Sequence, residues 1–128
     1  MSKPMKTVTT VAAVAATLPD LIGKIDTDLK DIAAQMAALK KAGLIYAGEH
    51  MKDGKYLVLL HPSQAGDKRV REYVGKDPLK IKEARDAIQR AKEYDELGRQ
   101  SELLEQVLVH GHRSLQEAAR VLSDRKLY

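Results

Sequence analysis

The fold is decided by residues 44–76, LIYAGEHMKDGKYLVLLHPSQAGDKRVREYVGK, the only part of the chain with a pattern typical of β-strands. Asp53-Gly54 separates two runs of strand-forming residues, and this dipeptide accepts the positive φ angles that a tight hairpin needs. Pro62 cannot donate to a β-ladder and therefore ends the second run. The pattern predicts a three-stranded antiparallel meander, with strands over 44–51, 56–61 and 68–74.

The second predicted strand differs from the other two because apolar or aromatic side chains occupy every position from 56 to 60. Both of its faces are therefore apolar, and we expect it to be the central strand. The third predicted strand carries Arg69 and Arg71 on either side of Val70, which indicates an edge strand with one solvated face. A sheet of only three strands needs a helix on its apolar face.

A heptad pattern precedes the strands, because apolar residues recur at alternating spacings of four and three. These residues are Leu18, Ile22, Ile25, Leu29, Ile32, Met36 and Leu39. Pro19 is suited to the first turn of a helix and Gly43 to its end, so the pattern predicts a coiled-coil-like helix of about 24 residues. We expect this seam to mediate self-association, as a homodimer, although it can equally pack on a helix of the same chain.

Residues 1–17 are expected to form a flexible or weakly helical segment. Lys3 and Lys6 followed by an Ala-rich run resemble a secretory signal, but Thr9 and Thr10 interrupt that run. Removal of residues 1–16 therefore remains an alternative to a cytoplasmic chain, which is the location that we favour. No run approaches the roughly 20 apolar residues of a membrane span, so no membrane partner is expected.

A second long helix is predicted to follow the strands, because Asp77 is a good N-cap and Pro78 a good first helical residue. Residues 110–112, His-Gly-His, are expected to break this helix, and Ser114 is expected to cap a short C-terminal helix. The predicted class is α+β: a long coiled-coil-like helix, a three-stranded antiparallel meander, a second long helix and a short C-terminal helix. The predicted divisions are 1–17, 18–109 and 110–128.

The composition limits the chemistry of the chain. With 128 residues it has the length of one domain, and with no cysteine it has no disulfide framework, thiol catalysis or common structural zinc site. Phosphate-binding glycine loops and nucleophile motifs of hydrolases are also missing from the sequence. His110 and His112 lie close together but lack a third metal ligand at a telling spacing. We therefore expect no catalytic residues, no metal and no cofactor; a small enzyme ranks third among the functions considered.

The positive charge of the chain is concentrated after its centre. The net charge of +4 is a weak indication of an anionic partner, but residues 68–92 contain nine basic residues against four acidic ones. A strand edge beside a helix N-terminus, whose free amides add to the positive field, predicts a phosphate-binding surface. Its candidate residues are Lys68, Arg69, Arg71, Lys76, Lys80, Lys82 and Arg85. The alternative is an ordinary solvated surface that the neighbouring carboxylates balance.

Three motifs of the chain resemble the arm-type DNA-binding module of tyrosine recombinases. They are Gly54-Lys55-Tyr56-Leu57, the KRVREYVGK run of residues 68–76, and Glu83-Ala84-Arg85. In that module three strands precede a helix with an acidic-Ala-Arg step, and the resemblance covers about residues 44–92. The chain departs from it because Leu57 and Leu59 stand where such sheets usually carry aromatic residues. The resemblance implies DNA binding through the sheet and the helix start.

Residues 18–108 also resemble a group of small bacterial proteins, often carried on mobile elements, in which a coiled helix, a meander and a second coiled helix follow one another. Together the resemblances imply a non-enzymatic DNA-binding or accessory protein of a bacterial mobile element. The alternative is a structural or adaptor protein that docks a protein partner through its coiled-coil helices.

Overall fold

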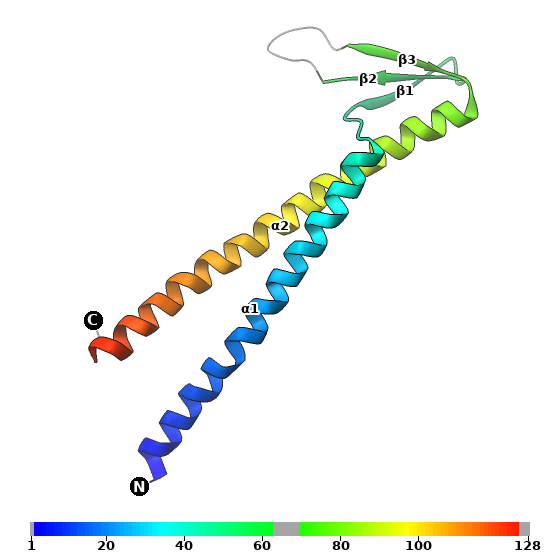
Figure 1. The fold of residues 1–128 in the computed structure, drawn as a ribbon. Coiled ribbons are helices and arrows are strands. Elements are labelled where there is room, and N and C mark those ends of the chain that lie inside the picture. The colour runs from blue at the N-terminus through cyan, green and yellow to red at the C-terminus, as the bar shows by residue number, and fades with distance from the viewer. Residues whose placement is uncertain (1, 63–69, 126–128) are drawn as a thin grey trace. The chain divides into compact units, whose positions relative to one another are not determined.

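The structure, a computed structural model, describes residues 2–62 and 70–125. Along the chain, a long helix is followed by three strands and then by a second long helix (Figure 1). The elements are α1 Ser2–Ala42, β1 Gly48–Lys52, β2 Tyr56–Leu60, β3 Arg71–Gly75 and α2 Pro78–Asp124. The predicted α+β class, with the order helix, meander, helix, is confirmed.

The chain divides into two compact units, and both helices contribute to each of them. The sheet unit is Ala34–Gly98. The helical unit consists of α1 up to Ala33 and α2 from Arg99 onward. Both helices continue across the predicted divisions after residues 17 and 109.

The first helix begins at Ser2, so residues 2–17, for which a flexible or weakly helical segment was expected, belong to α1. The Ala-rich composition favours a helix, and the hydroxyl groups of Thr10 and Thr17 do not interrupt it. Each donates to the carbonyl oxygen of the preceding turn, over 2.8 Å and 2.6 Å. Pro19 lies inside the helix instead of in its first turn, where it removes one backbone hydrogen bond.

The second helix also continues beyond its predicted end. It starts at Pro78, as predicted, and the backbone N–H of Leu79 donates to the Asp77 carboxylate over 3.0 Å, which confirms the N-cap. It runs without a break through residues 110–112, so the separate C-terminal helix was a wrong prediction. A single glycine costs a helix only about 1 kcal/mol, and strong helix formers occupy most of residues 102–106 before Gly111 and 115–120 after it.

The hairpin between β1 and β2 follows the prediction closely. Asp53 and Gly54 adopt φ angles of 55° and 66°, and the N–H of Lys55 donates to the carbonyl of Lys52 over 3.1 Å. The strands are shorter than predicted, since β1 begins at Gly48 and β3 at Arg71. The segment before β1 is instead attached to α2 through Ile45, whose N–H donates to the carbonyl of Ala87 over 3.2 Å.

The sheet has the order β1-β2-β3 with antiparallel neighbours, which confirms β2 as the central strand and β3 as an edge. Leu57 and Leu59 of β2 are fully buried and pack against Ala84 and Ile88 of α2. The small side chain of Ala84 permits a close approach of helix and sheet. Four half-buried residues complete this core: Ile45, Ala47, Val74 and Ile81.

The end of α1 is held by a side chain of α2. Gly43 has a φ angle of 111°, as expected of a helix stop, and its N–H donates to the carbonyl of Leu39 over 3.1 Å. Arg90 donates through Nε to the carbonyl of Gly43 over 2.8 Å and through Nη2 to that of Ala42 over 3.3 Å. A cation at these free carbonyls also favours the helix dipole, so Arg90 has a structural role.

One stretch of α1, Lys6–Ala42, is long and apolar enough to cross a membrane by length and composition alone. Its best 18-residue window has a mean hydropathy of 1.4 and is 0% buried. The expectation that no run is sufficiently apolar was therefore too strong. A secretory signal or the core helix of a soluble protein meets the same criterion.

Candidate nucleic-acid interface

The strand register assigns the side chains of the sheet to two faces. Leu57 and Leu59 point to α2, and residues that lie directly opposite one another share a face. The inner face therefore carries Glu49, Met51, Leu57, Leu59, Glu72 and Val74. The outer face carries His50, Lys52, Tyr56, Val58, Leu60, Arg71 and Tyr73.

Both carboxylates of the strands lie on the inner face and have partners there. Oε1 of Glu49 accepts a hydrogen bond from Nε of Arg85 over 2.7 Å. Oε1 of Glu72 lies 3.1 Å from Nε2 of His61. The described strand residues thus contribute no carboxylate to the outer face.

Two tyrosines form the centre of the outer face. The ring centroids of Tyr56 and Tyr73 lie 5.9 Å apart, with an angle of 33° between the ring planes. Tyr73 lies opposite Val58, which is buried, and the register shifts only beyond this pair, where Leu57 lies opposite Gly75. Tyr56 is half-buried, whereas Tyr73 is 63% exposed. An exposed aromatic ring is therefore held against a second ring on the solvated side of the sheet.

Two cations of the outer face are available to an anion. Lys52 is the last residue of β1, opposite Tyr56, and Arg71 is the first residue of β3, opposite Leu60. Both side chains are exposed, and neither makes an ion pair with another residue in the described parts of the chain. Their charge is thus free to interact with a phosphate group.

The seven cations that the sequence suggested are only partly brought together. Lys68 and Arg69 lie outside the described residues, and Lys76 and Lys80 are exposed around the start of α2. Nζ of Lys82 lies 2.9 Å from a carboxylate oxygen of Asp86, and Arg85 binds Glu49. Of the seven, only Arg71 is a described residue of the outer face.

Sequence reasoning missed Lys52, His50 and the tyrosine pair as members of one surface. The Asp53-Gly54 signal did not give their register. Three residues, 53–55, lie between Lys52 and its partner Tyr56, whereas a two-residue turn would pair Lys52 with Lys55 and move Lys52 and His50 to the other face. Tyr73 lies opposite Val58 in the same register that pairs Arg71 with Leu60.

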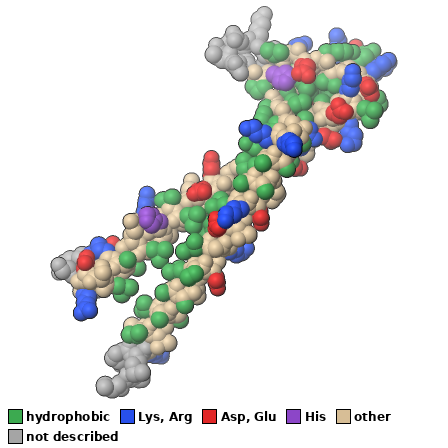
Figure 2. Space-filling view, viewed as in Figure 1, with side chains coloured by type: hydrophobic (Ala, Val, Ile, Leu, Met, Phe, Trp, Pro, Cys, Tyr) green, Lys and Arg blue, Asp and Glu red, His purple; other side chains and the backbone are tan. Residues whose placement is uncertain are grey.

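The helical unit contains an apolar groove of about 580 Å³ between its two helical segments. Figure 2 shows apolar side chains along both segments. The groove is lined by Leu18, Leu21, Ile22 and Ile25 of α1 and by Val107, Leu108, Gly111, His112, Ser114 and Leu115 of α2. The predicted seam thus faces α2 of the same chain in part, yet leaves apolar surface open to solvent.

Burial of the seam changes along α1. Ile32 is 8% exposed, Ile22 45% and, further toward the N-terminus, Val8 69%. Leu18, Ile25, Leu29, Met36 and Leu39 are half-buried. Val8, Val11 and Ala15 continue the alternating spacing of three and four upstream of Leu18, so the heptad pattern begins ten residues before the predicted seam.

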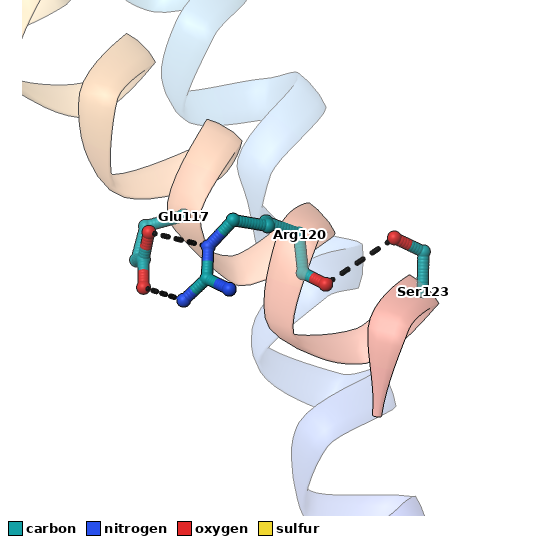
Figure 3. A network of polar contacts seen from close by, with 3 residues as sticks. All are labelled: Glu117, Arg120 and Ser123. Carbon is teal, nitrogen blue, oxygen red and sulfur yellow. Dashed lines mark hydrogen bonds and ion pairs between the residues drawn. The ribbon is translucent and has the colours of Figure 1, made fainter. Parts of the chain in front are cut away.

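A surface ion pair lies near the end of α2 (Figure 3). The Arg120 guanidinium donates through Nη2 to Oε1 of Glu117 over 2.6 Å and through Nε to Oε2 over 3.1 Å. This bidentate contact lowers the pKa of Glu117, through the hydrogen bonds first and the positive charge second. The Ser123 hydroxyl donates to the Arg120 carbonyl over 3.3 Å. The pair stabilises this turn of the helix.

A hollow of about 370 Å³ lies between the segment before β1 and α2. Its polar wall contains Lys92, Asp95 and Tyr46, whose hydroxyl donates to Oδ1 of Asp95 over 2.9 Å. That hydrogen bond is the main reason why the pKa of Tyr46 is raised, and partial burial and the charge of Asp95 act in the same direction. The hydrogen bond ties the segment before β1 to α2.

Within residues 2–62 and 70–125, no group of three or more His, Asp or Glu side chains could hold a metal ion. Comparisons of the chain with protein-family models, with curated proteins and with solved structures found no match.

Proposed function

We propose that this chain is a non-enzymatic, self-associating DNA-binding protein that contacts phosphates through the outer face of its sheet. The observation that supports the proposal is the sorting of charge by the sheet: Glu49 and Glu72 are engaged on the inner face, while Lys52 and Arg71, on the outer face, form no ion pair with any residue that the structure describes. The setting of a bacterial mobile element rests on the sequence resemblances alone.

Contacts of this kind give affinity without reading a base sequence. Lysine and arginine neutralise phosphates and release bound counterions, so the affinity falls steeply with salt. Lys76 and Lys80, exposed at the start of α2, are further cations of the predicted surface. Lys82 and Arg85 are excluded from the proposed contact because each already binds a carboxylate.

The test compares two double variants that remove the same charge. Lys52→Ala/Arg71→Ala should weaken binding of a DNA duplex and reduce the slope of log affinity against log salt by about 2, since each phosphate contact contributes about 0.9. Lys82→Ala/Arg85→Ala is the matched control and should change both quantities much less. Equal effects of the two pairs, or no binding of either duplex or single-stranded DNA by the wild type at about 50 mM salt, would contradict the proposal.

The proposed self-association uses the open part of the heptad seam in the helical unit. Val8, Val11 and Ile22 follow a spacing that suits a second helix, yet their side chains are substantially exposed. A row of exposed apolar side chains on one face of a helix is typical of an interaction site. A second copy of the chain is a suitable occupant, because it brings helices with the same repeat.

Charge complementarity also favours a second copy. Residues 20–31 of α1 contain four aspartates and two lysines, whereas residues 110–125 of α2 contain three arginines, one glutamate and one aspartate. The acidic stretch of one copy can therefore face the basic stretch of another in a symmetric pair.

Sedimentation of single variants tests this part of the proposal. Val11→Asp and Ile22→Asp place a charge on the seam and should convert a dimer into a monomer. Ala13→Asp adds the same charge to the same helix away from the seam, and should leave the mass unchanged. A monomeric wild type, or a dimer that survives both seam variants, would contradict self-association. Wild-type binding to neutral lipid vesicles that Val11→Asp abolishes would assign the stretch to a membrane instead.

The adaptor function is the second candidate, and the apolar groove favours it. A helix from another protein can lie between α1 and α2 as an amphipathic ligand, anchored on Ile22, Ile25 and Val107. A monomeric wild type that takes up a helical peptide of complementary charge, and loses it in Ile25→Asp, would support this function.

A further inference from the structure

We propose that the outer face of the sheet binds single-stranded nucleic acid, with a base stacked on the ring of Tyr73. This inference rests on the proposed function and names the class of nucleic acid that the site takes. Single-strand binding proteins combine cations that follow the backbone with aromatic rings on which bases stack. The outer face has both components within one sheet of three strands.

Tyr73 has the geometry of a stacking platform. The residue is 63% exposed, and its ring contacts the half-buried Tyr56 at a centroid distance of 5.9 Å. A tyrosine has only two side-chain torsions, and contact with a neighbouring ring restricts them further. A base that stacks on Tyr73 therefore costs little side-chain conformational entropy.

Arg71 and Lys52, which form no ion pair within residues 2–62 and 70–125, lie on the same face of the sheet as this ring. Arg71 precedes Tyr73 by two residues on the same face of β3, which corresponds to about 7 Å along the strand. Lys52 lies on the same face, on the other edge strand β1, opposite Tyr56. A strand whose base lies on Tyr73 can thus bring its flanking phosphates to Arg71 and Lys52 across the sheet.

Single strands suit this face better than duplexes because the bases of a duplex are already stacked on one another. An aromatic ring that lies on a sheet meets only base edges and phosphates in a groove. The Tyr56–Tyr73 contact also strengthens the sheet as a cross-strand pair. That role alone accounts neither for the exposure of Tyr73 nor for two cations on the same face that have no ion-pair partner among the described residues.

Fluorescence anisotropy with the full chain tests the inference, using an oligothymidylate of about 15 nucleotides and a duplex of equal length as probes. Tyr73→Ala should raise the dissociation constant for the single strand at least about fivefold and that for the duplex less than about twofold. Tyr73→Phe keeps the ring and should stay within about twofold of the wild type. Tyr73→Leu keeps an apolar side chain in the strand without a ring and should resemble Tyr73→Ala.

The control variant Tyr46→Ala removes an exposed tyrosine away from the outer face and should bind both probes normally, and far-UV circular dichroism verifies the fold of each variant. Equal losses on both probes in Tyr73→Ala, or no loss, would overturn the stacking inference. The proposed function still stands in that case if Lys52→Ala/Arg71→Ala weakens binding. If the wild type binds neither the single strand nor the duplex at about 50 mM salt, the stacking inference and the proposed function are both overturned.

Discussion

Nε of Arg85 lies 2.7 Å from Oε1 of Glu49, and this ion pair joins α2 to β1 on the inner face of the sheet. The two side chains are 52% and 40% exposed, so solvent screens their attraction. A double-mutant cycle with Arg85→Ala and Glu49→Gln should give a coupling energy of about 0.2–1 kcal/mol, measured by urea unfolding. A coupling of zero would show that the contact does not persist in solution.

The fully buried side chain of Leu59 should contribute much more to stability than any surface pair. Leu59→Ala removes methyl groups from the contact with α2 and leaves a cavity, so the free energy of unfolding should fall by about 2–5 kcal/mol. Leu79→Ala is the control, since that side chain is 71% exposed and its truncation should change the free energy by less than about 0.5 kcal/mol. If the two variants lower the free energy of unfolding equally, measured with urea, Leu59 does not lie in the core.

Gly98 marks the contact of α2 with α1 in the sheet unit. A Cβ atom at this position would lie 3.5 Å from Cε of Met36, which is an ordinary van der Waals distance. Gly98→Ala should therefore stabilise the protein by about 0.5–1 kcal/mol through helix propensity. Gly98→Leu should destabilise it, because the larger side chain must displace Met36. Thermal unfolding measures both, and a loss of stability in Gly98→Ala would show that the helices approach more closely.

Much of the sheet unit could be predicted because its turns and helix ends depend on residues that are neighbours in the sequence. The Asp53-Gly54 turn, the stop at Gly43 and the cap at Asp77 each depend on a few neighbouring residues, and all three were predicted. The apolar character of β2 on both faces likewise indicated its central place. Such signals need no knowledge of distant parts of the chain.

Helix ends and the interface were harder to predict, for physical reasons. Pro19 and Gly111 are typical helix boundaries, yet both lie inside a long helix. An interior proline costs about 3 kcal/mol and an interior glycine about 1 kcal/mol, and the helix-forming residues on both sides outweigh these costs. The cations from Lys80 to Arg85 looked equivalent in the sequence. Whether a cation is free depends on which carboxylate the fold brings to it, as Glu49 shows for Arg85 across 36 residues.

The hydrogen bond between Tyr46 and Asp95 makes stability depend on pH in the alkaline range. The Asp95 carboxylate accepts a hydrogen bond from the phenol hydroxyl over 2.9 Å and thereby raises the pKa of Tyr46 in the folded chain. A group whose pKa is higher in the folded state stabilises the fold below its ordinary pKa, about 10 for tyrosine, and loses this contribution as the pH rises through the folded value. The urea midpoint should therefore fall above about pH 10, and less so in Tyr46→Phe.

Absorbance at the phenolate band measures the same group directly. Asp95→Asn removes the negative charge and weakens the acceptor, so the pKa of Tyr46 should decrease toward its ordinary value. Tyr46→Phe identifies the titration step of Tyr46, because it removes this phenol from the titration curve. If Asp95→Asn leaves that step unchanged, the carboxylate of Asp95 does not hold the phenol in solution.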